Sequence, residues 1–164
     1  MLKTAHANDL QDVLTLNQNA LPHVSSVELA DMRRFLDKAA YFKVAGSDTG
    51  ILNGFLIALG PGLDYASENY RWFCDTYDEF LYIDRIVIAE NTRGQGLGKV
   101  FYKDVIETAR TLAPRLTCEV NSRPPNPQSM AFHEHFGFAA VGTQATEGGT
   151  KEVSLLSLDL GNSE

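Results

Sequence analysis

Hydrophobic and polar residues alternate along this chain with two periods, one typical of strands and one typical of helices. The stretch "FLYIDRIVIA" (80–89) is rich in β-branched and aromatic residues and predicts a strong strand. Residues 98–112 repeat apolar positions at helical spacing, which predicts a helix with one buried face. The same reasoning predicts further strands at 2–6, 41–46, 51–59, 115–121, 137–146 and 151–160, and further helices at 7–21, 25–40 and 127–136.

Capping and turn residues mark the ends of several of these elements. Ser25 followed by Glu28 predicts a capping box at the start of the second helix. The cluster "SDTG" (47–50) predicts the turn between two strands. Asn126 and Gly137 are typical of the first and last boundaries of a helix, and they predict where the last helix starts and ends.

Residues 60–79 break the periodic pattern. The stretch "GPGLDYASENYRWFCDTYDE" is rich in turn-forming and aromatic residues and has no clear period. We predict a long loop, which is either functional or a surface excursion held by its own aromatic side chains.

The predicted elements follow the order β-α-α-β-β-loop-β-α-β-α-β-β. This order indicates an α/β or α+β protein with a mixed sheet, and the β-α-β unit at residues 80–121 should be parallel. A chain of 164 residues suits one domain, residues 1–164.

Composition excludes several functions. The net charge is -7 and the isoelectric point is near 5.0, whereas nucleic-acid binding requires a basic face. The start "MLKTAHANDL" lacks the apolar region of a secretory signal, and "GFLIALG" is too short to span a membrane. Cys74 and Cys118 are read as reduced thiols, and "HEH" does not have zinc-binding spacing. We therefore expect a cytoplasmic protein that binds no nucleic acid, membrane or metal.

A glycine-rich turn, "NTRGQGLGKV" (91–100), separates the strong strand from the following helix. A nucleotide-triphosphate loop would need glycine at position 93 and a hydroxyl at position 100, where Arg93 and Val100 stand. A dinucleotide fingerprint fails at Lys99, where it needs glycine. Backbone N–H groups, a helix dipole and flanking cations still fit an anion. The turn therefore predicts a diphosphate site.

The stretch "RGQGLG" (93–98) resembles the R/Q-x-x-G-x-G/A signature of the GNAT N-acetyltransferase superfamily. A later stretch, "NPQSMAFHEHFGF" (126–138), is similar to that family's second motif, a short helix that ends in a G-F pair. The element order also matches over nearly the whole chain. The resemblance implies the GNAT fold: a mixed, mostly antiparallel sheet with a parallel β-α-β core and helices on both faces. It also implies acetyl-CoA as cosubstrate, with its diphosphate on the glycine turn.

The family pattern implies which residues hold acetyl-CoA. The turn would bind the diphosphate through main-chain N–H groups and through charge. The preceding strand would pair with the pantetheine arm through its backbone. The expected cofactor-binding residues are Ile86, Val87, Ile88, Arg93, Gly94, Gln95, Gly96, Leu97, Gly98, Lys99, Asn126 and Ser129. Asn126 and Ser129 are equally well explained as helix-capping residues.

Acetyl transfer to an amine needs a proton acceptor for the ammonium. Asp84 is our first candidate for this base, because the family often has Glu or His at this point of the strand. Side chains alternate between the two faces of a strand, so Tyr82 should lie on the same face as Asp84 unless a bulge shifts the alternation. Glu79 is the second candidate. The alternative for Asp84 is a salt bridge to Arg85 or another cation.

The family commonly uses a Tyr in the second-motif helix to protonate the departing thiolate. His133 stands at that position here, which departs from the pattern. Histidine can donate a proton near neutral pH, so His133 is our candidate acid. The alternative is a structural or exposed histidine, with solvent as the proton source.

The chain is thus read as an acyl-CoA-dependent N-acetyltransferase that uses direct attack in a ternary complex. Its acceptor would be a small amine, an amino acid, or a peptide or protein amine, and we also consider a homodimer. An aromatic and acidic wall suits an amine. We expect that wall from Tyr65, Tyr70, Trp72, Phe73 and Tyr77, with the acids Asp64, Glu68, Asp75, Asp78 and Glu79. The alternative function is an inactive acyl-CoA-binding sensor or interaction module of the same fold.

Overall fold

The computed structural model describes residues 1–47 and 49–161, so Asp48 of the predicted "SDTG" turn lies outside the described residues. The strands are β1 (Leu2–Thr4), β2 (Tyr41–Gly46), β3 (Leu52–Leu59), β4 (Leu81–Ile88), β5 (Arg115–Arg123), β6 (Ala139–Thr146) and β7 (Lys151–Asp159). The helices are α1 (Leu10–Asn19), α2 (Leu29–Lys38), α3 (Glu68–Thr76), α4 (Leu97–Ala109) and α5 (Pro127–Phe136). Short 3-10 turns occur at Ala7–Asp9, Glu90–Thr92 and Glu147–Gly149.

The described strands form one mixed sheet in the order β1-β2-β3-β4-β5-β7-β6. Strands β4 and β5 are parallel, and β1–β2, β2–β3, β5–β7 and β6–β7 are antiparallel. The predicted fold class and the parallel β-α-β core are therefore confirmed. The chain divides into two compact units. The first comprises Met1–Leu59 and Ile83–Val105, and the second comprises Gly60–Tyr82 and Ile106–Glu164.

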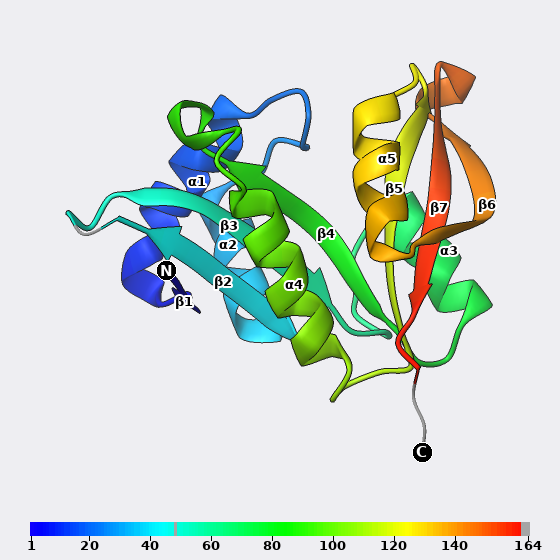
Figure 1. Cartoon of the computed structure of the whole chain (residues 1–164), viewed down its shortest axis with the longest axis horizontal. Coiled ribbons are helices and arrows are strands. Elements are labelled where there is room, and N and C mark those ends of the chain that lie inside the picture. The colour runs from blue at the N-terminus through cyan, green and yellow to red at the C-terminus, as the bar shows by residue number, and fades with distance from the viewer. Residues whose placement is uncertain (48, 162–164) are drawn as a thin grey trace. The chain divides into compact units, whose positions relative to one another are not determined.

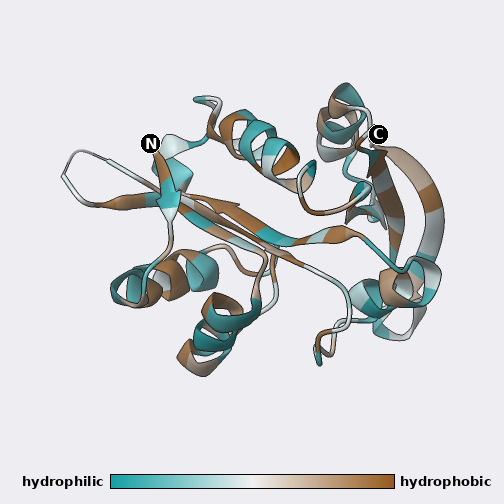
Figure 2. Cartoon of the chain, turned by 90° about the horizontal axis from the view of Figure 1, so that it is seen from below, coloured by the Kyte–Doolittle hydropathy of each residue, from teal (hydrophilic) through white to brown (hydrophobic). Residues whose placement is uncertain are grey.

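In the first unit, the sheet lies between two layers of helix. Figures 1 and 2 show α4 on one face of β2–β4, and α1 with α2 on the other. The helices in Figure 2 carry both hydrophobic and hydrophilic segments, as expected for helices with one buried face. The core between these layers is filled by large apolar side chains, among them Val13, Met32, Phe55, Leu56 and Phe101.

In the second unit, α3 and α5 lie on opposite faces of the strands β5–β7 (Figures 1 and 2). Buried residues of β5 and β7, such as Leu116 and Leu155, form the centre of this core. The amide of Gln144 on β6 donates to Asn69 of α3 at 2.8 Å. As predicted, α5 starts at the Asn126 cap and ends at Gly137, whose φ is 101°.

The prediction of a loop across residues 60–79 was wrong, because nine of these residues form α3. Ser67 caps this helix by accepting the N–H of Tyr70. Tyr70 and Phe73, three residues apart, are its buried residues. Two large aromatic anchors on one helical face stabilise a helix that is too short to show a full apolar period.

The second helix also starts later than predicted. Its N-cap is Glu28, and the reciprocal capping bonds join Glu28 with Asp31 rather than Ser25 with Glu28. The helix therefore begins at Leu29, and Ser25 belongs to the connection before it. Ser25 instead bonds to Arg85, as described below.

Candidate active site

The turn before α4, residues 93–99, is shaped by its backbone. Gly94 and Gly96 have φ values of 80° and 85°, in the left-handed region that costs other residues roughly 1 kcal/mol or more. The first hydrogen bond of the helix joins the N–H of Val100 to the carbonyl of Gly96 at 3.2 Å. The N–H groups of residues 97–99 precede this bond, so the helix itself gives them no acceptor. Such donors at the positive end of a helix dipole fit an anion.

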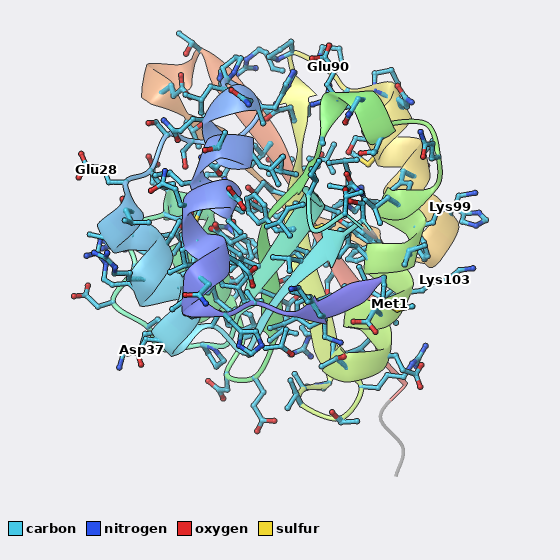
Figure 3. The ribbon with its side chains drawn as sticks, turned by 90° about the vertical axis from the view of Figure 1, so that its left-hand side faces the viewer. Met1, Glu28, Asp37, Glu90, Lys99 and Lys103 are labelled. Carbon is cyan, nitrogen blue, oxygen red and sulfur yellow. The ribbon has the colours of Figure 1, made fainter. Side chains whose placement is uncertain are left out.

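Positive side chains surround this turn. The first turn of α4 contains no acidic residue, and all of its residues are described. Figure 3 shows Lys99 and Lys103, which are one helical turn apart, extending away from the same side of α4. The guanidinium of Arg93 donates from Nε to the carbonyl of Ile88 at 3.2 Å, which ties the turn to the end of β4. The local charge therefore suits a phosphate group.

A cavity of about 430 Å³ lies beside the end of β4. It is lined by Leu16, Asn19, Ala20, Val87, Ile88, Ala89, Glu90, Asn91 and Arg93. Val87, Ile88 and Arg93 are predicted cofactor residues, whereas Ile86 does not line the cavity. The end of α1 was missed by the sequence reasoning, because no motif or turn signal marks it as part of a site.

Asp84 is bound to its neighbour Arg85. The Nε of Arg85 lies 2.7 Å from the Oδ2 of Asp84, and each side chain is only 4% exposed. The alternative reading of Asp84, a salt bridge to Arg85, is therefore the arrangement that the structure contains. The Oδ2 atom of Asp84 is therefore engaged by the guanidinium of Arg85.

Tyr82 lies in the second unit and contacts a different carboxylate. Its hydroxyl donates to Oε1 of Glu119 on β5 at 2.7 Å, at the last rung of the β4–β5 pairing, where Tyr82 is opposite Thr117. Tyr82 is buried, whereas Glu119 is half-buried. Sequence reasoning missed Glu119, because a single acid in an apolar strand carries no motif. Glu79 is exposed, and its carbonyl accepts from Arg115.

His133 is buried in the second unit, only 6% exposed, between the rings of Phe132 and Phe138. Burial lowers the pKa of His133, and the hydrogen bond to the Ser129 carbonyl raises it less, so the net direction is downward. Nδ1 lies 2.8 Å from that carbonyl. A carbonyl only accepts, so Nδ1 carries the hydrogen of this bond. Burial disfavours the protonated ring and so argues against the acid prediction for His133, which stays a prediction.

Asn126 and Ser129 form the capping interaction that was the alternative to cofactor binding. The Oδ1 of Asn126 accepts the backbone N–H of Ser129 at 3.1 Å. This bond uses the amide oxygen of Asn126 within α5.

The five aromatic residues of segment 60–79 do not form one wall. Tyr70 and Phe73 are 1% and 0% exposed and belong to the core, which corrects their assignment to a substrate surface. The hydroxyl of Tyr70 donates to the Gly60 carbonyl at 2.6 Å, and burial raises its pKa to about 12. Apolar aromatic rings gain more by burial in the core than on an open face. Tyr65, Trp72 and Tyr77 are half-buried and stay candidates.

The predicted site residues therefore fall into two groups. The first unit contains Asp84, Ile86, Val87, Ile88 and the turn at 93–99. The second unit contains Glu79, Tyr82, Asn126, Ser129, His133 and the aromatic residues. Within the described residues, no group of three or more His, Cys, Asp or Glu side chains is placed to hold a metal ion. No helix in the same part of the chain is long and apolar enough to cross a membrane.

Comparison with known proteins gives consistent results. Residues 17–138 match the model of the acetyltransferase (GNAT) family. Over 77 residues the chain is 36% identical to the peptidyl-lysine N-acetyltransferase YjaB of Salmonella typhimurium, a match that spans 47% of this chain and about half (49%) of that relative. The structure is similar to a putative phosphinothricin N-acetyltransferase, with a TM-score of 0.75, 21% identity and 100% and 99% of the two chains covered. It also resembles Arabidopsis thaliana NAA60 in complex with acetyl-CoA, with a TM-score of 0.77, 16% identity and 97% and 98% coverage.

Proposed function

The chain belongs to the acetyltransferase (GNAT) family, and from this premise we propose that it transfers an acetyl group from acetyl-CoA to a primary amine. The observation that carries the proposal is the turn at residues 93–99. Its donors and cations have the chemistry that a diphosphate requires. A similar fold, that of NAA60, occurs in complex with acetyl-CoA. We propose that the family match over residues 17–138, which includes parts of both units, reflects a single working domain.

Acetyl-CoA would be held mainly by backbone groups. The N–H groups of residues 95–99 would donate to the diphosphate, and Arg93 and Lys99 would add charge. The cavity at the end of β4, next to Arg93, offers space for atoms that adjoin the diphosphate. The backbone of residues 86–88 would pair with the pantetheine arm. The predicted transfer is direct: the amine nitrogen bonds to the acetyl carbon while the carbon–sulfur bond breaks.

We assign the proton acceptor to Glu119, with Asp84 as the second candidate and Glu79 as the third. Glu119 is half-buried and its carboxylate is oriented by the Tyr82 hydroxyl. Asp84 is almost fully buried and pairs with Arg85. A carboxylate that keeps some access to solvent can pass the proton on to water.

We assign protonation of the departing thiolate to solvent. Burial lowers the pKa of His133, and its Nδ1 bonds to the Ser129 carbonyl, so we do not assign this proton to the ring. Without a residue that protonates the thiolate, the rate of acetyl transfer should depend on how readily the CoA thiolate leaves. Transfer still proceeds, because a thiolate is a good leaving group at neutral pH.

The proposed acceptor is a lysine side chain of a peptide or protein, with a free N-terminus and a small amine as the next choices. YjaB, similar over part of the chain, is a peptidyl-lysine N-acetyltransferase. The net charge of -7 favours cationic acceptors over anionic ones. A cytoplasmic location, and the formation of a homodimer, stay predictions.

Two measurements test this function. Calorimetry with acetyl-CoA, CoA and ATP should give binding of the first two only, and ATP binding without CoA binding would refute the diphosphate assignment. A thiol-release assay should then detect turnover with a lysine peptide whose N-terminus is blocked, a lysine-free peptide with a free N-terminus, or phosphinothricin. Tight acetyl-CoA binding without turnover on this panel would favour the sensor function.

A further inference from the structure

Gly54, in the interior strand β3, is packed against the backbone of β4. A Cβ atom added at Gly54 would lie 2.7 Å from the carbonyl oxygen of Val87, which is shorter than an ordinary contact of a Cβ atom. It would also lie 3.2 Å from Cδ1 of Ile88 and 3.4 Å from Cε2 of Phe101. Glycine inside a strand weakens the strand, and it often marks a place where another backbone approaches closely. At Gly54 the missing side chain makes room for a main-chain carbonyl.

Hydrogen bonds also tie the end of β4 to β3. The N–H of Ala89 donates to the carbonyl of Asn53, the residue before Gly54, at 2.7 Å. The hydroxyl of Thr92 donates to the Ala89 carbonyl at 3.0 Å, which braces the chain just after β4. The end of β4 is therefore held against β3 and cannot move away freely to admit a side chain at residue 54.

The carbonyl of Val87 departs from the direction that a regular sheet would give it. Ladder carbonyls lie in the plane of a sheet, whereas a Cβ atom projects from one of its faces. A carbonyl that nearly touches the Cβ position of the neighbouring strand is therefore turned toward that face, as at a β-bulge. The face is the one that α4 covers in Figure 2, because Phe101 of α4 meets the same Cβ position.

The turned peptide lies at the cavity beside the end of β4. The carbonyl of Val87 and the N–H of Ile88 belong to one planar trans peptide, so they point in opposite directions. The N–H of Ile88 therefore turns toward the other face of the sheet, which carries α1 (Figure 1). Leu16 and Asn19 of α1 line the cavity together with Val87 and Ile88. The absence of a side chain at Gly54 thus lets a main-chain donor face the space assigned above to acetyl-CoA.

We propose that Gly54 is a positioning residue for the pantetheine arm of acetyl-CoA. By giving room to the Val87 carbonyl, it sets the direction of the peptide between Val87 and Ile88, and so the donor that meets the arm. The proposal rests on the proposed acetyl transfer from acetyl-CoA, and it assigns Gly54 no contact with acetyl-CoA. A side chain at residue 54 should weaken the binding of the arm and leave the diphosphate on the glycine turn unchanged.

The decisive readout compares CoA with its nucleotide half, which has the diphosphate but lacks the pantetheine arm. Calorimetry gives the Kd of CoA, and displacement of CoA gives the Kd of the nucleotide half. The Kd of the nucleotide half divided by the Kd of CoA measures what the arm contributes to binding. This ratio is independent of the fraction of folded protein, so a merely structural role would not change it. Gly54→Ala should lower the ratio about tenfold, the effect of weakening one or two hydrogen bonds to the arm.

Ala89→Pro tests the same attachment with a substitution that the backbone allows. The φ of Ala89 is -58°, which proline adopts, and the variant lacks the N–H that donates to Asn53. The proline ring takes the place of this N–H and moves the end of β4 away from β3. We expect the ratio to fall about threefold, in the same direction as in Gly54→Ala.

The matched control is Gly142→Ala on β6, in the second unit. A Cβ atom at Gly142 would lie 2.6 Å from Cζ2 of Trp72, so this variant is also overpacked, although the atoms it meets belong to Trp72 and not to β4. Both glycine variants should lose stability. The ratio should fall in Gly54→Ala and stay within about a factor of 1.5 of wild type in Gly142→Ala.

An unchanged ratio in Gly54→Ala would overturn the proposal, as would equal falls in Gly54→Ala and Gly142→Ala. If Gly54→Ala does not fold, an unchanged ratio in Ala89→Pro would overturn it instead. Wild-type binding of CoA without binding of the nucleotide half would refute the diphosphate assignment and this proposal with it. If wild-type protein binds neither ligand, the proposed function itself fails. Binding of both ligands by wild type, with unchanged ratios in the variants, rejects only the role of Gly54.

Discussion

The N-termini of α4 and α5 follow strands of the same sheet but differ in what meets their free N–H groups. At α5, the amide of Asn126 accepts the N–H of Ser129, and Pro127 removes one donor altogether. At α4, the residue before the helix is Gly96, which has no side chain to cap it. The protein thus caps the first turn of α5, whereas the N–H groups that start α4 have no acceptor within the helix and no side-chain cap from Gly96.

The motif at α4 and the motif at α5 both resemble the same family. The difference between their N-termini predicts that the motif at α4 binds a ligand and that the motif at α5 stabilises the fold. A helix that caps itself has fewer donors for a ligand, so the family motif at α5 reads here as a folding signal. A helix that starts at a glycine lacks a side-chain cap, which costs only a few tenths of a kcal/mol, and a bound anion can return it. The contrast predicts that α4 controls affinity for acetyl-CoA and α5 controls stability.

The largest expected effect is at Gly96. Gly96→Asp should weaken the binding of CoA by at least about 100-fold, because a carboxylate would face the diphosphate. A Cβ added at Gly96 meets no described atom within 4 Å, and the positive φ costs Asp roughly 1 kcal/mol, so the fold should persist with somewhat lower stability. Calorimetry measures the affinity, and circular dichroism checks the fold.

The matched control for this variant is Gly96→Asn, which has almost the same shape without the charge. Asn tolerates the left-handed backbone, so we expect an affinity loss below about tenfold. Wild-type affinity in Gly96→Asp would contradict the placement of the diphosphate. Equal losses in the two variants would indicate a steric effect rather than repulsion.

A second comparison concerns the two carboxylates. Glu119→Gln keeps an acceptor for the Tyr82 hydroxyl, and we expect kcat to fall by about 100-fold with little change in stability. Asp84→Asn removes the negative charge beside buried Arg85 and should cost about 3 kcal/mol of stability. Denaturation and single-turnover kinetics on the folded fraction separate the two effects. A larger loss of kcat in Asp84→Asn would return the role of base to Asp84.

At α5 the expected effect is on folding. Asn126→Ala should lower the free energy of unfolding by about 1 kcal/mol, the usual cost of losing an N-cap. The Kd of acetyl-CoA should stay within about twofold, because the amide oxygen is used inside the helix. Urea denaturation and calorimetry measure the two quantities. An affinity loss without a stability loss would reverse our interpretation of Asn126.

The features that could be predicted from the sequence are those that one short stretch of chain encodes. The turn at 93–99 could be predicted from its own glycines and cations. The ends of α5 could be predicted from Asn126 and Gly137, which favour the two boundaries of a helix. The helix α3 was missed because two of its rings, Tyr70 and Phe73, are buried against Phe80 and Tyr82, beyond the end of the segment. Their aromatic character suggested a ligand surface, although burial explains it.

The side-chain chemistry could not be predicted, because it depends on long-range partners. The ion pair of Asp84 with Arg85 was one of the two alternatives that the sequence left open, and the structure contains it with both side chains buried. Arg85 meets Asn17 and Ser25, which are 68 and 60 residues away along the chain. The proposed role of Glu119 rests on its bond with Tyr82, which depends on the register that pairs β4 with β5. No local pattern contains this information.

The smallest expected effect is the pH dependence of stability that His133 contributes. Burial lowers the pKa of His133 below its ordinary value, so the unfolded chain binds the proton more readily than the folded one. This contribution is fully present above the ordinary pKa of about 6.5 and is lost as the pH falls through the lowered pKa.

His133→Asn keeps a donor near the position of Nδ1 but cannot titrate, so Tm should fall less between pH 7.5 and pH 5.5 than in wild type. His135→Asn, on the same helix with an exposed ring, is the control and should keep the wild-type profile. Parallel profiles for His133→Asn and wild type would mean that the pKa of His133 is the same in the folded and the unfolded chain, so that burial would no longer argue against His133 as the acid.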